Sequence, residues 1–304
     1  MFGGLGAAFG RRRPGVGIEI EGDEVLVAAW GADGRLRLRA AGGGAERALA
    51  DLAEREKLEG AAAVLVMPPE RYQLFPLHLP PLPAEELREA ARFKVRELID
   101  FPLDEAVVDA FELPEAAQRG GERALWAVVA RAGDVGRLVR AVRDAGLDLV
   151  AIDIAELALR EVAAVFDAEA QGVAVLALHG EDGLLGVYRG EWFYLARRLE
   201  LGWAALADGD EATWDRVVLE VQRSLDYYER HVLQPLPARL LVYPGDRLSG
   251  EALMYLNAQL SLAVEPLLPE RLPEVRVDVE EAADGRGLYA VGAALRARRE
   301  AGRR

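Results

Sequence analysis

The sequence predicts an α/β protein of two domains that share one order of strands and helices, with a small α+β subdomain inserted into the first. Three observations predict this fold class. The chain has 304 residues, a length that suits two domains better than one. The order strand, hairpin, strand, turn, strand, helix, strand occurs twice, which indicates a duplication. A segment of different character separates the two copies.

The first copy is predicted to be a three-stranded meander followed by a helix and a buried strand. Apolar runs separated by polar turns, such as Glu21 to Glu24, indicate the hairpins. The elements are expected at residues 16–20, 25–30, 35–39, 45–57 and 61–67. Residues 1–14 precede the first strand and are expected to form a flexible N-terminus.

The second copy repeats this order in the second half of the chain. Its strands are expected at residues 173–178, 184–188, 192–196 and 239–243, with a long helix at 211–231 before the last of them. Polar turns separate the first three strands. We therefore expect domain 1 to span residues 15–171 and domain 2 to span residues 172–304.

The segment from about residue 71 to residue 147 is predicted to be the inserted subdomain. Three prolines within residues 80–83 fix an extended entry, because each restricts its own φ and disfavours helix in the residue before it. A helix follows with Glu85 and Glu86 in its first turn, where the helix dipole favours acidic side chains. Strands at 107–113 and 124–130 and a helix at 134–144 complete the α+β pattern.

Composition excludes several classes of function. The chain carries 37 basic and 51 acidic residues, and its net charge of -14 repels nucleic-acid phosphates. It contains no cysteine, which excludes disulfides, thiolate metal sites and cysteine nucleophiles and fits a reducing compartment. No run reaches the ~18 consecutive apolar residues of a spanning helix. We expect a soluble, cytoplasmic protein with no nucleic-acid partner.

Four segments carry a resemblance to a known family when they are taken in order. They are Gln73 to Pro80, Phe93 to Pro102, Ala145 to Leu159, and Leu219 to Tyr228. Together they resemble the PilM/MshI family of type IV pilus assembly proteins, most closely MshI, from about residue 16 to residue 295. The resemblance implies an actin-like (ribonuclease H-like) fold of duplicated βββαβα domains with an inserted α+β subdomain in the first.

The resemblance also implies a function. Such a chain is expected to be a scaffold of MSHA-type pilus assembly, peripheral at the cytoplasmic face of the inner membrane. It would bind the N-terminal cytoplasmic peptide of a bitopic PilN- or MshJ-like protein and contact the assembly ATPase. The peptide is expected in a groove between the first domain and its insert, with contacts from Leu87, Ala91, Phe93, Val95 and Phe101. Alternatively, these side chains form the core of the insert.

Three loops depart from the pattern of family members that bind ATP. Such members begin with a sequence like Asp-Ile-Gly-Ser, whereas this chain has Glu19-Ile20-Glu21-Gly22, which puts a second carboxylate where phosphate would sit. The second hairpin has His179 and Gly180 but no hydroxyl side chain, and the third loop has Gly245 and Asp246. We therefore expect a degenerate cleft, no cofactor and no enzymatic activity.

Two other functions remain open. The chain could be an active actin-like protein that binds ATP and Mg²⁺ and controls pilus assembly through its nucleotide state. It could also be a GspL-like cytoplasmic component of a type II secretion system. The three histidines, His78, His179 and His231, lack the spacing of metal ligands, and no serine lies in a nucleophile elbow. Neither a metal site nor a catalytic residue is expected.

Overall fold

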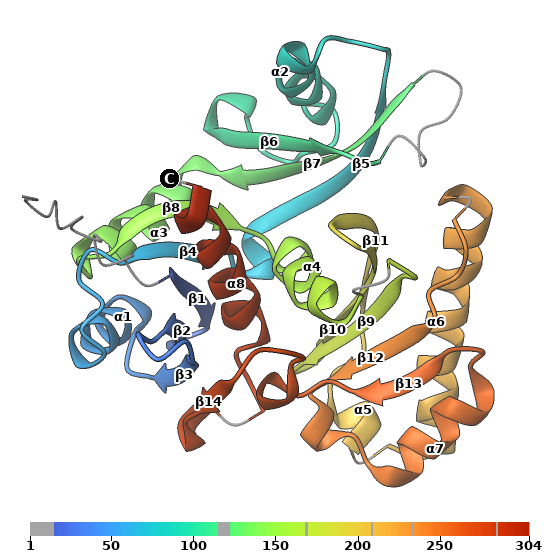
Figure 1. The fold of residues 1–304 in the computed structure, drawn as a ribbon. Helices are drawn as coiled ribbons and strands as arrows, with labels where there is room; N and C mark the ends of the chain where they lie inside the picture. Colours follow the sequence, from blue (N-terminus) through green and yellow to red (C-terminus); the bar gives the residue numbers. More distant parts are fainter. Residues whose placement is uncertain are drawn as a thin grey trace, which may run out of the picture.

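The computed structural model describes residues 15–114, 122–167, 170–207, 209–232, 234–283 and 285–303. The N-terminus that we expected to be flexible, residues 1–14, lies outside the described residues. Two large sheets with their helices form the body of the molecule, and a smaller three-stranded sheet with one helix lies at the top of the view in Figure 1.

The sheet of domain 1 has six strands in the order β14-β3-β2-β1-β4-β8. They are β1 (Gly15–Glu21), β2 (Glu24–Trp30), β3 (Leu36–Ala41), β4 (Ala62–Val66), β8 (Asp148–Asp153) and β14 (Val277–Val279). The first three form an antiparallel meander, and the others add in parallel. Helix α1 (Ala45–Arg55) covers β2 and β3, because Leu49 and Leu52 lie on its one apolar face.

The sheet of domain 2 has five strands in the order β11-β10-β9-β12-β13. They are β9 (Val173–His179), β10 (Asp182–Arg189), β11 (Trp192–Leu199), β12 (Arg239–Tyr243) and β13 (Ala263–Pro266). Its helices are α5 (Ala204–Ala207), α6 (Glu211–Val232) and α7 (Gly250–Gln259). The order and directions match β3-β2-β1-β4-β8 of domain 1, so the predicted duplication is confirmed.

Helix α6 is the longest helix of the described residues, with 22 residues, and seven of them are buried along one face. The opposite face carries charged side chains, so the helix is amphipathic. Throughout the part of the chain that the structure describes, no helix combines the length and the apolar character needed to cross a bilayer.

The inserted subdomain is a three-stranded antiparallel sheet in the order β5-β7-β6 with a helix on one face. Its elements are β5 (Tyr72–Leu79), α2 (Ala84–Val95), β6 (Ala106–Glu112) and β7 (Arg123–Arg131). Helix α3 (Ala132–Asp144), predicted as part of the insert, packs on α1 and β8 of domain 1 as well as on β6 and β7 of the insert. Its buried Leu138 and Val142 belong to the domain 1 core, so the insert ends at β7.

Short 3₁₀ helices complete the connections. They lie at η1 (Pro69–Arg71), η2 (Leu103–Glu105), η4 (Gly245–Arg247), η5 (Pro269–Arg271) and η6 (Glu281–Ala283).

The last helix of each half of the chain packs on the strands of the other half. Helix α4 (Ala155–Phe166), which ends the first half, packs on β9, β10 and β11. Helix α8 (Leu288–Arg303), which ends the second half, packs on β1, β2 and β4, and the two helices pack on each other (Figure 1). At Gly292 a Cβ would overlap the backbone of Ala158, so the glycine allows this close approach. The predicted division at 171/172 therefore does not separate the packed units.

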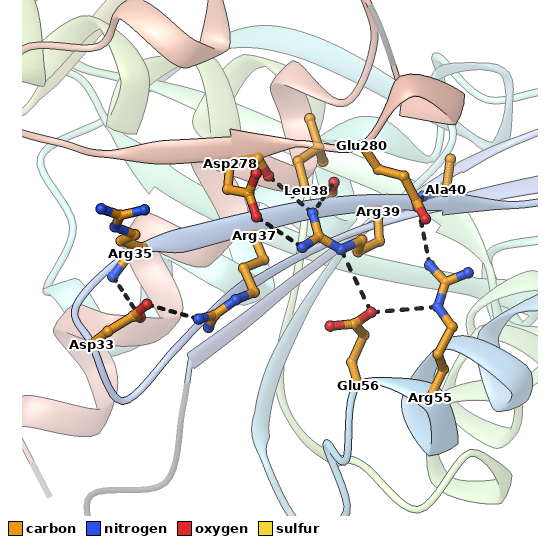
Figure 2. A network of polar contacts seen from close by, with 10 residues as sticks. All are labelled: Asp33, Arg35, Arg37, Leu38, Arg39, Ala40, Arg55, Glu56, Asp278 and Glu280. Carbon is orange, nitrogen blue, oxygen red and sulfur yellow. Dashed lines mark hydrogen bonds and ion pairs between the residues drawn. The ribbon is translucent and has the colours of Figure 1, made fainter.

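Strand β14 is tied to domain 1 by the ionic network of Figure 2. The guanidinium of Arg39 lies 2.9 Å from a carboxylate oxygen of Asp278 on β14 and 3.5 Å from one of Glu56. Arg55 donates to Glu280 at 3.0 Å. These contacts join residues 277–280 to β3 and α1, so β14, like α8, packs with domain 1, although both follow domain 2 in sequence.

Candidate functional site

A cavity of about 230 Å³ lies between the two domains, where the first hairpin of each domain meets the other. Strand β1 contributes Glu19 and Glu21, the β1–β2 turn contributes Gly22, and the end of β9 contributes His179. Tyr289, from the start of α8, forms one wall. The structure thus brings together two of the three loops that the sequence analysis singled out.

Glu19 is the buried acid of this site, with 3% of its surface exposed. Its Oε2 accepts a hydrogen bond of 2.9 Å from the backbone N–H of Ala290, at the N-terminus of α8. Its Oε1 is buried and has no hydrogen-bond partner among the described residues. Burial, reinforced by the negative charge of Glu21, raises the pKa of Glu19 to about 7.

Glu21 and His179 face each other across the cavity. The Nδ1 of His179 lies 3.4 Å from Oε1 of Glu21, and Arg286 lies 3.8 Å from Oε2 of Glu21. The hydrogen bond with His179 is the main cause that lowers the pKa of Glu21, and the positive charge of Arg286 adds to it. The Nε2 of His179 is buried without a partner in the described part of the chain.

Two tyrosines hold the imidazole of His179 in place. The ring centroid of His179 lies 4.7 Å from that of Tyr289 and 5.8 Å from that of Tyr243. The Tyr243 hydroxyl donates to the carbonyl of Gly285 at 3.1 Å. Neither tyrosine is among the predicted site residues. Tyr243 could have been found, because it ends the predicted strand 239–243, whereas nothing local marks Tyr289.

The third predicted loop does not line this cavity. Gly245 lies against the end of β13, where its N–H donates to the carbonyl of Leu267 at 3.0 Å. Its lack of a side chain allows that approach, since a Cβ would come within 2.7 Å of the same oxygen. The carboxylate of Asp246 points toward Gly285. Gly245 and Asp246 therefore lie outside this cavity, and the contacts of Gly245 are packing contacts.

The two remaining glycines of the predicted site, Gly22 and Gly180, have structural roles in their hairpins. Gly22 has a φ of 58°, which a residue with a side chain adopts at a cost, and it closes the β1–β2 turn. The carbonyl of Gly180 packs against Gly202, where a Cβ would overlap it. Gly22 borders the cavity, whereas Gly180 holds the second hairpin against the end of β11.

The expected peptide contacts are not gathered in a groove. Leu87, Ala91 and Val95 are fully or almost fully buried between α2 and the sheet of the insert, so they offer no surface to a peptide. Phe93 is 61% exposed on the outer face of α2, with the Arg96 guanidinium 4.4 Å from its ring centroid. Phe101 lies under Arg131, with 4.1 Å from its ring centroid to the guanidinium carbon. The structure therefore supports the alternative that Leu87, Ala91 and Val95 form the core of the insert.

A different groove, of about 290 Å³, lies between the insert and domain 1. Its apolar lining includes Phe111 and Val128 from the insert, Ile152 from β8 and Leu157 from α4. Its polar lining includes Arg296, which pairs with the buried carboxylate of Asp153 at 2.8 Å. Sequence reasoning missed these residues because five elements, from β6 to α8, supply them.

Comparisons with known proteins identify the fold of this chain. No protein-family model matches the chain, and no curated protein is similar to it in sequence. Among solved structures, a chain of the PilM-PilN type IV pilus biogenesis complex superposes with a TM-score of 0.74 at 22% identity, over 94% of this chain and 99% of that one.

Two other solved structures are similar at a lower level. The cytoplasmic domain of EpsL, an inner membrane component of the type II secretion system of Vibrio cholerae, gives a TM-score of 0.48 at 11% identity over 92% of each chain. A Bacteroides thetaiotaomicron protein with an actin-like ATPase fold gives 0.48 at 6% identity, over 93% of this chain and 96% of that one. By its two matching sheets and by the first of these comparisons, the chain has the actin-like fold of duplicated domains with an inserted subdomain, which it shares with a chain of the PilM-PilN complex.

Proposed function

We propose that this chain is a scaffold protein of the PilM/MshI family in the assembly of an MSHA-type type IV pilus. It acts at the cytoplasmic face of the inner membrane, where it binds the N-terminal cytoplasmic peptide of a PilN- or MshJ-like bitopic protein and contacts the assembly ATPase. The observation that carries the proposal is the similarity of nearly the whole chain, insert included, to a chain of the PilM-PilN type IV pilus biogenesis complex.

The groove between the insert and domain 1 is the peptide site in this proposal. Strand β6 is an edge strand of the insert sheet and β8 is an edge strand of the domain 1 sheet, within the described residues. An extended peptide can pair with such an edge through its backbone and place alternate side chains in an apolar groove. Val128 and Ile152 supply the apolar floor, while Arg296 and Arg299 at the rim come from α8.

Peptide binding tests this site directly. A fluorescein-labelled synthetic peptide, with the sequence of the cytoplasmic N-terminal segment of a PilN- or MshJ-like bitopic protein, should bind saturably in anisotropy measurements. Val128→Trp fills the groove and should weaken binding at least about tenfold. Phe93→Ala removes the exposed aromatic ring on α2 and should leave binding unchanged, and Met254→Trp on α7 controls for the added tryptophan. Absence of binding at hundreds of micromolar, or equal binding by Val128→Trp, would refute the site.

We also propose that the cavity between the domains holds no nucleotide and that the protein is not an ATPase. A helix N-terminus is a natural site for phosphate, but the start of α8 already donates to the carboxylate of Glu19. Glu21 adds a second carboxylate, and Tyr243 and Tyr289 flank His179. The cavity of about 230 Å³ is also smaller than the roughly 300 Å³ at which small-molecule sites begin. These residues do not fit a triphosphate.

Calorimetry separates this proposal from the active alternative. Titration with Mg²⁺-ATP should release no heat of binding, and millimolar Mg²⁺-ATP should leave the melting temperature unchanged, since a ligand of the folded state would raise it. Saturable heat with a raised melting temperature would favour an actin-like protein that binds ATP and switches with its nucleotide state.

A further inference from the structure

Glu19, Glu21 and His179 bring one donor atom each to within 4.8 Å of one another, and we propose that they bind one divalent transition-metal ion that bridges the two domains. Glu19 and Glu21 belong to β1 of domain 1, and His179 belongs to β9 of domain 2. The sequence analysis expected no metal site, because ligands that far apart in the chain show no spacing motif.

Two buried atoms point to a ligand in addition to the cluster itself. The Oε1 of Glu19 and the Nε2 of His179 are both shielded from solvent and have no hydrogen-bond partner among the described residues. A buried polar atom without a partner costs about 1–3 kcal/mol, so such atoms are rare unless something binds them. Both residues line the same cavity, together with Glu21.

The contacts around the cluster hold the donors in place. The N–H of Ala290 fixes Oε2 of Glu19 and leaves Oε1 for the ion. Arg286 lies near Oε2 of Glu21, on the side away from the Oε1 that faces His179. The ring of Tyr289 packs against the imidazole. Hydrogen bonds and packing of this kind orient metal ligands and raise affinity.

The donor set selects the class of ion. One imidazole nitrogen and two carboxylate oxygens suit Zn²⁺, Co²⁺ or Mn²⁺, with water completing the coordination. Mg²⁺ is disfavoured, because it prefers an octahedron of oxygen ligands and keeps most of its water. Two carboxylates also balance the charge of a divalent ion. Since the ligands come from both domains, the ion should hold the two hairpins together and stabilise the folded protein.

Metal titration of the full-length chain, stripped with a chelator, tests the proposal. Zn²⁺ and Co²⁺ should bind at one ion per chain, and Co²⁺ should give visible absorption bands typical of nitrogen and oxygen ligands. At about 100 times the dissociation constant, Zn²⁺ should raise the melting temperature by roughly 5 °C. Mg²⁺ at the same concentration should not.

Matched variants locate the ion. Since loss of an outer partner already costs 10–100-fold in affinity, His179→Ala and Glu21→Gln should each weaken Zn²⁺ binding at least about 100-fold. His231→Ala removes a histidine of α6 outside the cavity and should bind Zn²⁺ like the unaltered chain. Circular dichroism shows whether each variant is folded, and His179→Gln serves if His179→Ala is not. Less than 0.1 equivalent of tightly bound Zn²⁺, or equal affinity in His179→Ala and His231→Ala, would overturn the proposal.

Discussion

The carboxylate of Glu19 accepts a hydrogen bond of 2.9 Å from the backbone N–H of Ala290, a residue 271 positions later in the chain. The bond joins the first strand of domain 1 to the first turn of the last helix. A carboxyl group is stabilised there by the unpaired N–H groups of the helix and by its dipole. The side chain of Glu19 is thus part of the packing between β1 and α8.

Stability should fall as pH rises from about 4.5 to about 7 in chelator-treated buffer. The folded state keeps the proton of Glu19 up to a pKa of about 7, whereas the unfolded chain releases it near the ordinary value of 4.5. The folded state therefore binds more protons in this window, and the free energy of unfolding should drop by up to ~3 kcal/mol. Urea denaturation at several pH values measures the slope.

The matched variant for this prediction is Glu19→Gln, which cannot titrate and should flatten the slope. Glu21 and His179 are the titratable groups that face Glu19. The lowered pKa of Glu21 places its own contribution, a loss of stability as pH falls through that pKa, below this window. An unchanged slope in Glu19→Gln would show that Glu19 is not the group responsible.

Gly17→Ala should destabilise the protein by at least about 3 kcal/mol. The added methyl group would overlap the carbonyl of Ala290 and the amide of Ala294, and the backbone of α8 cannot move away without disturbing its contacts with β1. Gly133→Ala is the control. It adds the same methyl group on α3, where no atom lies within 4 Å, and should stabilise by about 0.5–1 kcal/mol through helix propensity. Equal effects of the two changes in chemical denaturation would contradict the packing described above.

Tyr72→Phe should cost about 1–3 kcal/mol, because it leaves a buried acid short of a partner. The Tyr72 hydroxyl donates to Oε2 of Glu156 at 2.6 Å and accepts from the N–H of Ala155 at 3.2 Å, so it joins β5 to α4. Burial already raises the pKa of Glu156, and the hydrogen bond from Tyr72 counteracts this rise. Tyr227→Phe, on the exposed side of α6, should leave the urea midpoint unchanged. A midpoint for Tyr72→Phe that matches that control would argue against the bond.

Arg296→Met should destabilise by about 3–5 kcal/mol, since it leaves the fully buried carboxylate of Asp153 without its charge partner. Arg55→Met removes a comparable ion pair with Glu280, but on the surface, and should cost no more than about 1 kcal/mol. The two midpoints in urea, measured side by side, give the comparison. If Arg55→Met proved as costly as Arg296→Met, burial would not be what makes the Asp153 pair important.

The local pattern of apolar and polar residues was sufficient to predict the strands and helices and their order. The strand predicted at 239–243 is β12, and the helix predicted at 211–231 is α6 with one residue more. The duplication and the insert follow from the same alternation of apolar and polar residues. Such patterns act over a few residues, so they are visible in the sequence without knowledge of distant contacts.

The candidate site was predicted only in part, for the same reason. The first two hairpin loops do meet, because hairpins at equivalent positions of a duplicated fold lie at equivalent edges of the sheets. The third loop lies outside this cavity, and Leu87, Ala91 and Val95 are buried in the insert. The sequence around Gly245 indicates only a loop glycine, whereas in the structure its backbone packs against Leu267. The sequence position of Leu87 is compatible with an exposed groove or with a core, and only its neighbours in the structure decide between the two.

The sequence by itself determined the strands, the helices, the repeat and the charge of the surface, since each depends on the local chain. Only the tertiary structure decided that α4 and α8 lie against each other's domains and that His179 faces Glu21. The contacts of α8 with domain 1 and the Glu21–His179 pair join residues more than a hundred positions apart, and they depend on complementary surfaces and on the space that glycines such as Gly17 and Gly292 leave for a neighbouring backbone. A hydrophobic pattern with a period of two or 3.6 residues contains no information about which distant residues pair.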